Sequence, residues 1–145
     1  MLEILIGSDH AGFELKNQIK KYFDKSYNFT DIGTFSEKSV DYPDFANELC
    51  KKKIEENIKF GVLICGSGLG MSMVANRHKN IRAALCLNEE MAKLSREHND
   101  ANVLVLGSRL ISCEEAIKCF IMFFNSKFEG NRHQARLDKF NDVNI

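Results

Sequence analysis

The chain has 145 residues, 44% of them hydrophobic, and its 20 basic side chains balance 20 acidic ones to a formal net charge of +0. A chain of this length normally folds as one unit with a full core, so we expect a single domain over residues 1–145. The balanced charge argues against nucleic acid as a partner, and the apolar runs are too short to cross a membrane.

The cysteine count is odd, and the spacings C-x-x-C and Cys/His that are typical of zinc sites are missing: the five are Cys50, Cys65, Cys86, Cys113 and Cys119. We therefore expect free thiols, no metal and no cofactor. The first six residues contain neither a basic leader nor a small-residue cleavage site and are expected to be part of the fold. Free thiols without a signal sequence predict a cytoplasmic location.

Five short apolar runs predict strands over residues 2–6, 29–32, 60–65, 81–87 and 102–106. Helical periodicity follows each run and predicts helices over residues 13–23, 43–58, 71–77, 89–98 and 113–124. Pro43 suits a first helical turn, and Ser112 with Glu115 forms a capping box. The pattern predicts an α/β fold: a three-layer, doubly wound, five-stranded parallel sheet, Rossmann-like or flavodoxin-like, with ligands at the carboxyl ends of the strands.

A short helical tail is expected between Glu129 and Phe140, outside the repeated strand–helix units. If this tail is helical, Arg132 and Arg136 project from one face, as two guanidinium groups that hold one phosphate would need. An ordinary solvated helix with surface charges would show the same pattern.

The segment Cys65–Gly70, with the sequence Cys-Gly-Ser-Gly-Leu-Gly, follows the third predicted strand and leads into the third helix. The glycines at Gly66, Gly68 and Gly70 allow backbone N–H groups to face a ligand, and such a turn before a helix binds anions. The same field favours the thiolate form of Cys65. A buried structural cysteine is the alternative, and it explains Cys86 well.

Three chemistries use such a loop. Dinucleotide binding requires G-x-G-x-x-G after the first strand, whereas this chain has G-x-G-x-G after the third. A cysteine phosphatase needs an arginine where this chain has Met71. In the third chemistry, Cys65 removes a proton α to a carbonyl group and the backbone amides stabilise the resulting oxyanion. The sequence contains every group that this proton transfer requires.

Four further side chains follow strands at the same predicted edge: Asp9, His10, Tyr42 and Arg109. An imidazole beside a helix N-terminus is well placed to donate to a phosphate or a sugar oxygen, which favours a binding role for His10. Asp9 is equally well explained as a helix cap, Tyr42 as a packing aromatic and Arg109 as a surface charge.

His98 and Asn99 precede the fifth predicted strand and therefore lie at the amino edge of the sheet, roughly 15 Å or more from Cys65 at about 3.3 Å per strand residue. They either cap a helix or serve the site of a neighbouring subunit. The same argument applies to Arg132 and Arg136, because the helix before them runs back to that edge.

Six motifs in this order resemble the type B ribose-5-phosphate isomerases over essentially the whole chain. They are Gly-Ser-Asp9-His10-Ala-Gly, Asp41-Tyr42-Pro43, Cys65-Gly-Ser-Gly-Leu-Gly, Ser95-Arg-Glu-His98-Asn99-Asp, Leu106-Gly-Ser-Arg109 and Glu-Gly-Asn-Arg132-His-Gln-Ala-Arg136. The resemblance implies a homodimer or dimer of dimers with shared active sites, and metal-free interconversion of ribose 5-phosphate and ribulose 5-phosphate in pentose phosphate metabolism.

In this family the proton-transfer base is a cysteine at the position of Cys65 or, in another branch, a glutamate at the position of Met71, so the chain resembles the cysteine branch. The resemblance assigns the enediolate oxygen to the backbone of residues 67–70. It assigns ring opening to Asp9, Ser67 and His98. Threonine is common in relatives where this chain has Ser67, a change that keeps the hydroxyl group.

The resemblance also implies the substrate contacts. Tyr42 and Asn99 would contact sugar hydroxyls, and the phosphate would be held by His10, Arg109, Arg132 and Arg136. Galactose-6-phosphate and allose-6-phosphate isomerases share most of these residues and remain alternatives. A non-catalytic module that binds a nucleotide or another phosphate through the glycine loop is the alternative outside enzymes.

Overall fold

The computed structural model describes residues 1–142, so the last part of the predicted domain, residues 143–145, lies outside the described residues. Five parallel strands form one sheet in the order β2-β1-β3-β5-β4. They are β1 (Glu3–Ser8), β2 (Asn28–Asp31), β3 (Phe60–Cys65), β4 (Ala83–Leu85) and β5 (Val103–Gly107). The predicted fold class is confirmed.

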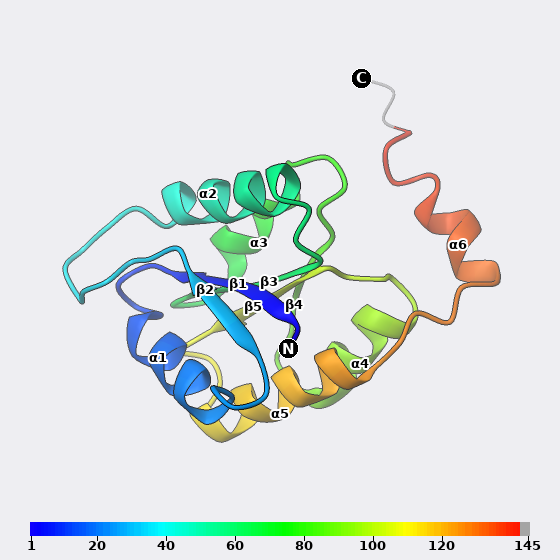
Figure 1. The fold of residues 1–145 in the computed structure, drawn as a ribbon. Helices are drawn as coiled ribbons and strands as arrows, with labels where there is room; N and C mark the ends of the chain where they lie inside the picture. The colour runs from blue at the N-terminus through cyan, green and yellow to red at the C-terminus, as the bar shows by residue number, and fades with distance from the viewer. Residues whose placement is uncertain (143–145) are drawn as a thin grey trace.

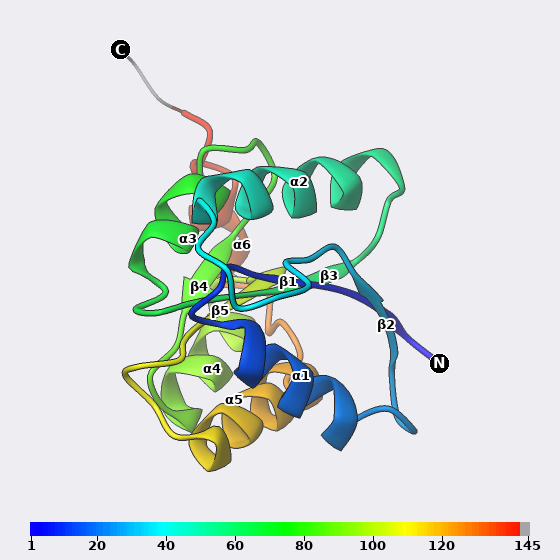
Figure 2. The same cartoon turned by 90° about the vertical axis from the view of Figure 1, so that its left-hand side faces the viewer.

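Helices cover both faces of the sheet. They are α1 (Phe13–Tyr22), α2 (Tyr42–Glu55), α3 (Leu69–Ala75), α4 (Glu89–Glu97), α5 (Cys113–Asn125) and α6 (Arg132–Leu137). Helices α2 and α3 lie on one face, and α1, α4 and α5 lie on the other (Figures 1 and 2). Helix α6 is the predicted C-terminal tail and projects from the layered body (Figure 1). None of the helices within residues 1–142 is long and apolar enough to cross a membrane.

Each face of the sheet has its own hydrophobic core because successive strand residues point to opposite sides. In β1, Ile4 and Ile6 belong to the cluster under α1, α4 and α5, whereas Leu5 belongs to the cluster under α2 and α3. Aromatic rings fill the first cluster, where Phe23 stacks on Phe120 with ring centroids 4.2 Å apart. All five strands are therefore held between two layers.

The observed elements differ from most of the predicted bounds by one to three residues, and two of these differences have a clear structural cause. Strand β4 covers only Ala83–Leu85 instead of residues 81–87, because it lies at the sheet edge and pairs with β5 alone. Helix α3 begins at Leu69, two residues before the predicted start, because Gly68 adopts a left-handed conformation with φ of 78° and ends the preceding turn there.

Hydrogen bonds join the loops at the carboxyl edge of the central strands. The Asp9 amide donates to the Ile64 carbonyl over 3.2 Å, and the Ser108 amide donates to the Cys65 carbonyl over 2.8 Å. The Ser108 hydroxyl donates to the Ala11 carbonyl, also over 2.8 Å. The loops after β1, β3 and β5 therefore form one connected platform.

Candidate active site

Cys65 ends β3 at the centre of this platform. Its side chain is buried, and its Sγ accepts a hydrogen bond of 3.1 Å from the Gly68 amide. The left-handed backbone at Gly68 aims that amide at the sulfur, and a side chain there would come within 2.5 Å of Leu85 Cδ1. Glycine is thus required at this position. A backbone donor on Sγ stabilises the thiolate form of a cysteine.

The rest of the loop presents polar backbone to the same side. The Ser67 hydroxyl accepts from the Leu69 amide over 3.2 Å, which closes a tight turn at the start of α3. The amides of Gly70 and Met71 in the first helical turn have no acceptor within the helix. Behind the loop, a side chain at Gly107 would come within 2.5 Å of the Ser67 carbonyl oxygen, so β5 packs directly against it.

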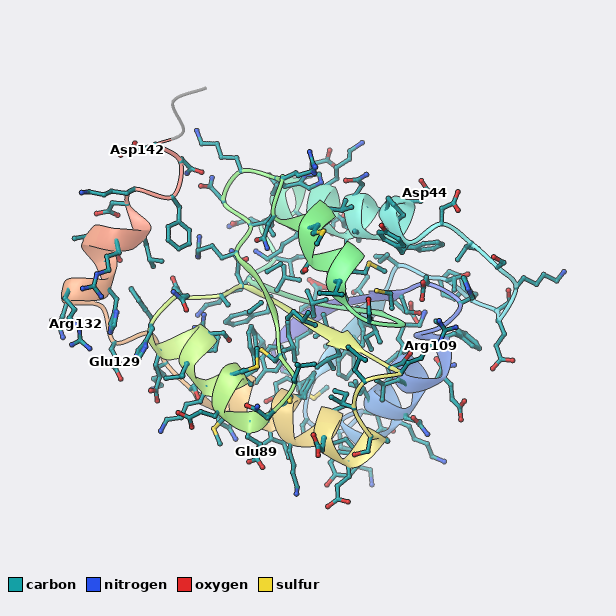
Figure 3. The ribbon with its side chains drawn as sticks, turned by 180° about the vertical axis from the view of Figure 1, so that it is seen from behind. Asp44, Glu89, Arg109, Glu129, Arg132 and Asp142 are labelled. Atoms are coloured by element: carbon teal, nitrogen blue, oxygen red, sulfur yellow. The ribbon has the colours of Figure 1, made fainter. Side chains whose placement is uncertain are left out.

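Arg109 lies on the Cys65 loop. Its amide donates to the Gly66 carbonyl over 2.9 Å, and its Nη1 lies 3.1 Å from the position that a Cβ at Gly66 would occupy. The glycine leaves room for the guanidinium group, which is an exposed positive charge on this loop (Figure 3). Arg109 and Cys65 therefore share one edge of one chain, as their positions in the sequence predicted.

Asp9 and His10 follow β1 on the same platform. Asp9 is buried, and its Oδ1 accepts from the Gly12 amide over 3.0 Å, so this carboxylate caps the turn before α1 while Gly12 itself is the N-cap residue. His10 accepts from the Val40 amide at Nδ1 over 3.1 Å. Because Nδ1 is an acceptor, the proton of the neutral ring is on Nε2, which can donate to a ligand.

Tyr42 is the first residue of α2, and its side chain is exposed. Its ring lies against α3, where a Cβ at Gly70 would be only 2.6 Å from Tyr42 Oη. Gly70 therefore makes room for the tyrosine. The aromatic ring is packed on one side and open on the other, so packing and ligand contact are both available to it.

The remaining predicted site residues lie at the end of the molecule opposite the platform. His98 is the C-cap of α4, and Arg132 and Arg136 are on α6. Figure 3 shows Arg109 and Arg132 at opposite ends of the molecule. The structure therefore does not bring His98, Arg132 or Arg136 to Cys65 within one chain, which agrees with the separation expected from the sequence.

A groove of about 790 Å³ lies at this second end, between α6 and the segment before β4. Its lining includes Asn99, Arg82, Gln134 and Phe140, and it contains none of the residues of the Cys65 platform. Asn99 is thus placed with α6 and not with the thiol.

Sequence reasoning did not single out His133 and Glu129. His133 is buried and stacks on His98, with ring centroids 4.3 Å apart and an angle of 17° between the planes. Burial and the neighbouring Arg132 lower the pKa of His133. The position of His133 between two predicted arginines was a local signal, but its contact with His98 is tertiary.

Buried thiols away from the loop are poor nucleophiles. Burial raises the pKa of Cys50 to about 11, of Cys86 to about 12 and of Cys119 to about 11. These three remain protonated near neutral pH and pack as small apolar side chains. The structural interpretation of Cys86 therefore holds.

The doubly wound sheet, with a thiol under a glycine-rich turn and with His10 and Arg109 on the same platform, places the chain in the class of α/β proteins that bind ligands at the carboxyl ends of their strands. Within that class, residues 4–140 match the family described as Ribose/Galactose Isomerase, and the chain belongs to this family.

Similar proteins cover nearly the whole chain. A "putative sugar phosphate isomerase" of Rickettsia bellii is 45% identical over 94% of this chain and 96% of its own. The crystal structure of a ribose 5-phosphate isomerase from Thermotoga maritima has a TM-score of 0.95 and 48% identity, over 98% of this chain and 99% of that one. The Mycoplasma genitalium ribose-5-phosphate isomerase B with bound ribulose-5-phosphate has a TM-score of 0.89 and 42% identity, over 95% and 93%.

Proposed function

We propose that this protein interconverts ribose 5-phosphate and ribulose 5-phosphate through an enediolate, with Cys65 as the base. The observation that carries the proposal is the hydrogen bond from the Gly68 amide to Cys65 Sγ at the carboxyl edge of the sheet. Membership of the isomerase family and the relative that binds ribulose-5-phosphate support this substrate class. The protein is an aldose–ketose isomerase of sugar phosphates.

The proton transfer needs only groups on the platform. In the forward direction the Cys65 thiolate removes the proton on C2 of the open-chain aldose, and the electron pair moves toward the C1 carbonyl oxygen. Backbone amides of residues 67–70 stabilise the negative oxygen of the enediolate. The proton of the C2 hydroxyl passes to the C1 oxygen, and the electron pair left on the C2 oxygen forms the ketone while the thiol returns its proton to C1.

The ligand is held from two sides. In this proposal His10 and Arg109 bind the phosphate from the platform, and Tyr42 contacts the sugar hydroxyls. Asp9 and Ser67 assist ring opening from the same chain.

A second chain supplies the remaining groups: His98 for ring opening, Asn99 for a hydroxyl, and Arg132 and Arg136 for the phosphate. Their place at the opposite end of the molecule supports a homodimer, or a dimer of dimers, in which each site uses two chains. The five cysteines are free thiols, which suits a cytoplasmic enzyme.

A hexose phosphate is the second candidate substrate, because the family description includes galactose isomerase. The test is a spectroscopic ketose assay with ribose 5-phosphate, allose 6-phosphate and galactose 6-phosphate, run with and without EDTA. We expect the highest kcat/KM with ribose 5-phosphate and no loss of activity in EDTA. Higher kcat/KM with a hexose phosphate would reassign the substrate, and ligand binding without any turnover would make the protein a binding module.

A further inference from the structure

Three potential metal ligands meet where α4 and α6 approach each other. They are His98, Glu129 and His133, and one ligand atom of each lies within 4.8 Å of the others. The Glu129 amide donates to the Glu97 carbonyl over 3.0 Å, which fixes the segment before α6 to the end of α4. Glu129 and Arg132 lie beside each other at this end of the molecule (Figure 3).

The Nε2 atom of His133 is a buried polar atom without a hydrogen-bond partner in the described part of the chain. The side chain of His133 is only 7% exposed, and Nε2 is buried with no hydrogen-bond partner among residues 1–142. The closest carboxylate oxygen, Glu129 Oε2, is 3.7 Å away, which is too long for a hydrogen bond. Two ligands on one tetrahedral zinc ion are separated by roughly 3.3 Å, because each bond is about 2.0 to 2.1 Å long.

His98 can approach the same cation position as His133 and Glu129. His98 stacks on His133, so the two rings lie side by side next to Glu129. Binding of zinc requires the three atoms to contract from within 4.8 Å of one another to the spacing of zinc ligands. Glu129 is exposed and His98 is half-buried, so both can rotate, while burial holds His133 in place.

We propose that His98, Glu129 and His133 form a binding site for one zinc-like divalent cation, with a fourth position left for water. Two imidazole nitrogens and one carboxylate oxygen are the donor set that zinc accepts, whereas magnesium and calcium prefer oxygen ligands alone. The cation plays no part in proton transfer at Cys65.

The consequence for activity rests on the proposed function, in which His98 assists ring opening in a neighbouring subunit's site. A cation on His98 occupies the nitrogen lone pair that ring opening would use. The site is therefore inhibitory, and zinc lowers turnover of the cyclic sugar phosphate.

Binding is tested on the full chain without any sugar, so the result does not depend on activity. Zn²⁺ is titrated against a chromophoric chelator, and Co²⁺ replaces it for absorption spectra that reveal sulfur ligands. We expect one ion per chain, no thiolate-to-cobalt band, and at least tenfold weaker binding in Glu129→Gln and in His133→Asn. His78→Asn is the matched control, because His78 bonds to Asn47 and lies outside the cluster. Circular dichroism verifies that each variant is folded.

Absence of binding, a thiolate-to-cobalt band, or unchanged affinity in folded Glu129→Gln would each overturn the site. The inhibitory role is tested separately by zinc inhibition of the isomerase. We expect the half-inhibiting concentration to rise at least tenfold in Glu129→Gln, whose activity without zinc is unchanged. Equal inhibition of both proteins would assign inhibition to another group and overturn the regulatory part.

Discussion

In the proposed mechanism the Cys65 thiolate acts as a base, and the Gly68 amide is the partner for its negative charge. Glycine is required there twice over, because φ is 78° and because Leu85 Cδ1 fills the space of a side chain. The chemistry proposed for one residue therefore depends on the backbone conformation three positions later.

Replacement of the thiol separates catalysis from binding. In Cys65→Ala we expect kcat to fall by at least about 10³-fold, because the proton-transfer base is lost. Binding of a phosphorylated sugar acid, measured by calorimetry, should change little, because affinity comes mainly from the phosphate contacts. Iodoacetamide should inactivate the wild-type enzyme, and substrate should protect it.

Cys86→Ala is the control, because Cys86 is a buried thiol whose pKa is raised to about 12 by burial. It should lose stability and keep turnover. Near-normal turnover in Cys65→Ala would show that Cys65 is structural and that another group is the base.

The role of a single residue could be predicted from the sequence only where its neighbours in the chain determine that role. The glycine spacing after a buried strand predicted a turn with free amides around Cys65, because backbone conformation is encoded within a few residues. The packing of Tyr42 against Gly70 and the stacking of His98 on His133 join distant segments, so no local pattern could indicate them.

At the scale of elements, Gly70 allows α2 and α3 to pack closely, because it leaves space on α3 for the Tyr42 ring of α2. Gly70→Ala adds a methyl group in the space that the Tyr42 ring occupies, so the ring must move. Because Tyr42 is proposed to contact sugar hydroxyls, we expect KM for ribose 5-phosphate to rise several-fold with a smaller change in kcat. Steady-state kinetics of the purified variant measures both constants.

Alanine favours a helix over glycine by about 1 kcal/mol, which offsets part of the cost of displacing the ring. Met73→Ala is the matched control, because Met73 is an exposed residue of the same helix. An unchanged KM in Gly70→Ala would remove Tyr42 from the substrate contacts.

An ion cluster fixes the loop after β2. Asp31 accepts from Lys16 and from Lys20 over 2.8 Å each, and from the Gly33 amide over 2.9 Å. The Gly33 carbonyl in turn accepts from the Ser8 amide at the end of β1. Burial alone raises the pKa of Asp31, but the hydrogen bonds from the lysines and Gly33 outweigh it and hold this pKa below its ordinary value.

The sign of the pH dependence follows from that direction. A carboxyl group with a lowered pKa in the folded state contributes stability at pH values above its unfolded pKa of about 3.9, and loses it as pH falls through the folded pKa. Asp31→Asn should therefore lower the free energy of unfolding by about 3 kcal/mol at pH 7, because it leaves Lys16 buried without its partner. The difference from wild type should shrink below about pH 4.

Urea unfolding at pH 7, 5 and 3.5 measures these differences. Glu56→Gln is the control, because the Lys52–Glu56 pair is exposed and should contribute far less. Equal stability of Asp31→Asn and wild type at pH 7 would show that the cluster does not hold the loop.

The elements themselves were largely predictable, because continuous apolar runs and helical periodicity are properties of short segments. The limits of β4 were not: residues 81–87 are apolar enough for a longer strand, but the ladder with β5 ends at Leu85. The position of β5 between β3 and β4 is set by packing of whole units, and a single sequence contains no direct signal for it.

For the whole molecule, the strand–helix alternation alone predicted that the site residues fall into two groups at opposite edges of the sheet. Each helix returns to the amino edge of the sheet, so residues at helix ends, such as His98, are separated from residues at strand ends, such as Cys65. Arg109 and Arg132 at opposite ends agree with this (Figure 3). A site that needs both ends has to be built from two chains.

Mixing two inactive variants tests this assembly. We expect Cys65→Ala and Arg136→Ala, refolded together, to recover about a quarter of wild-type sites. Half of the random dimers contain one chain of each kind. In such a dimer one site collects both defects, while the other combines a normal Cys65 with a normal Arg136. Activity of the mixture, with chain exchange verified by native mass spectrometry, measures the recovery.

Cys65→Ala refolded with Arg109→Ala is the matched control. Both residues lie on the platform of one chain, since the Arg109 amide donates to the Gly66 carbonyl beside Cys65. Every site in a mixed dimer then has one defect, and no activity should return. If the Arg136 mixture were equally inactive despite exchange, Arg136 would belong to its own chain's site, and the argument for a shared site would fail while the assignment of Cys65 stood.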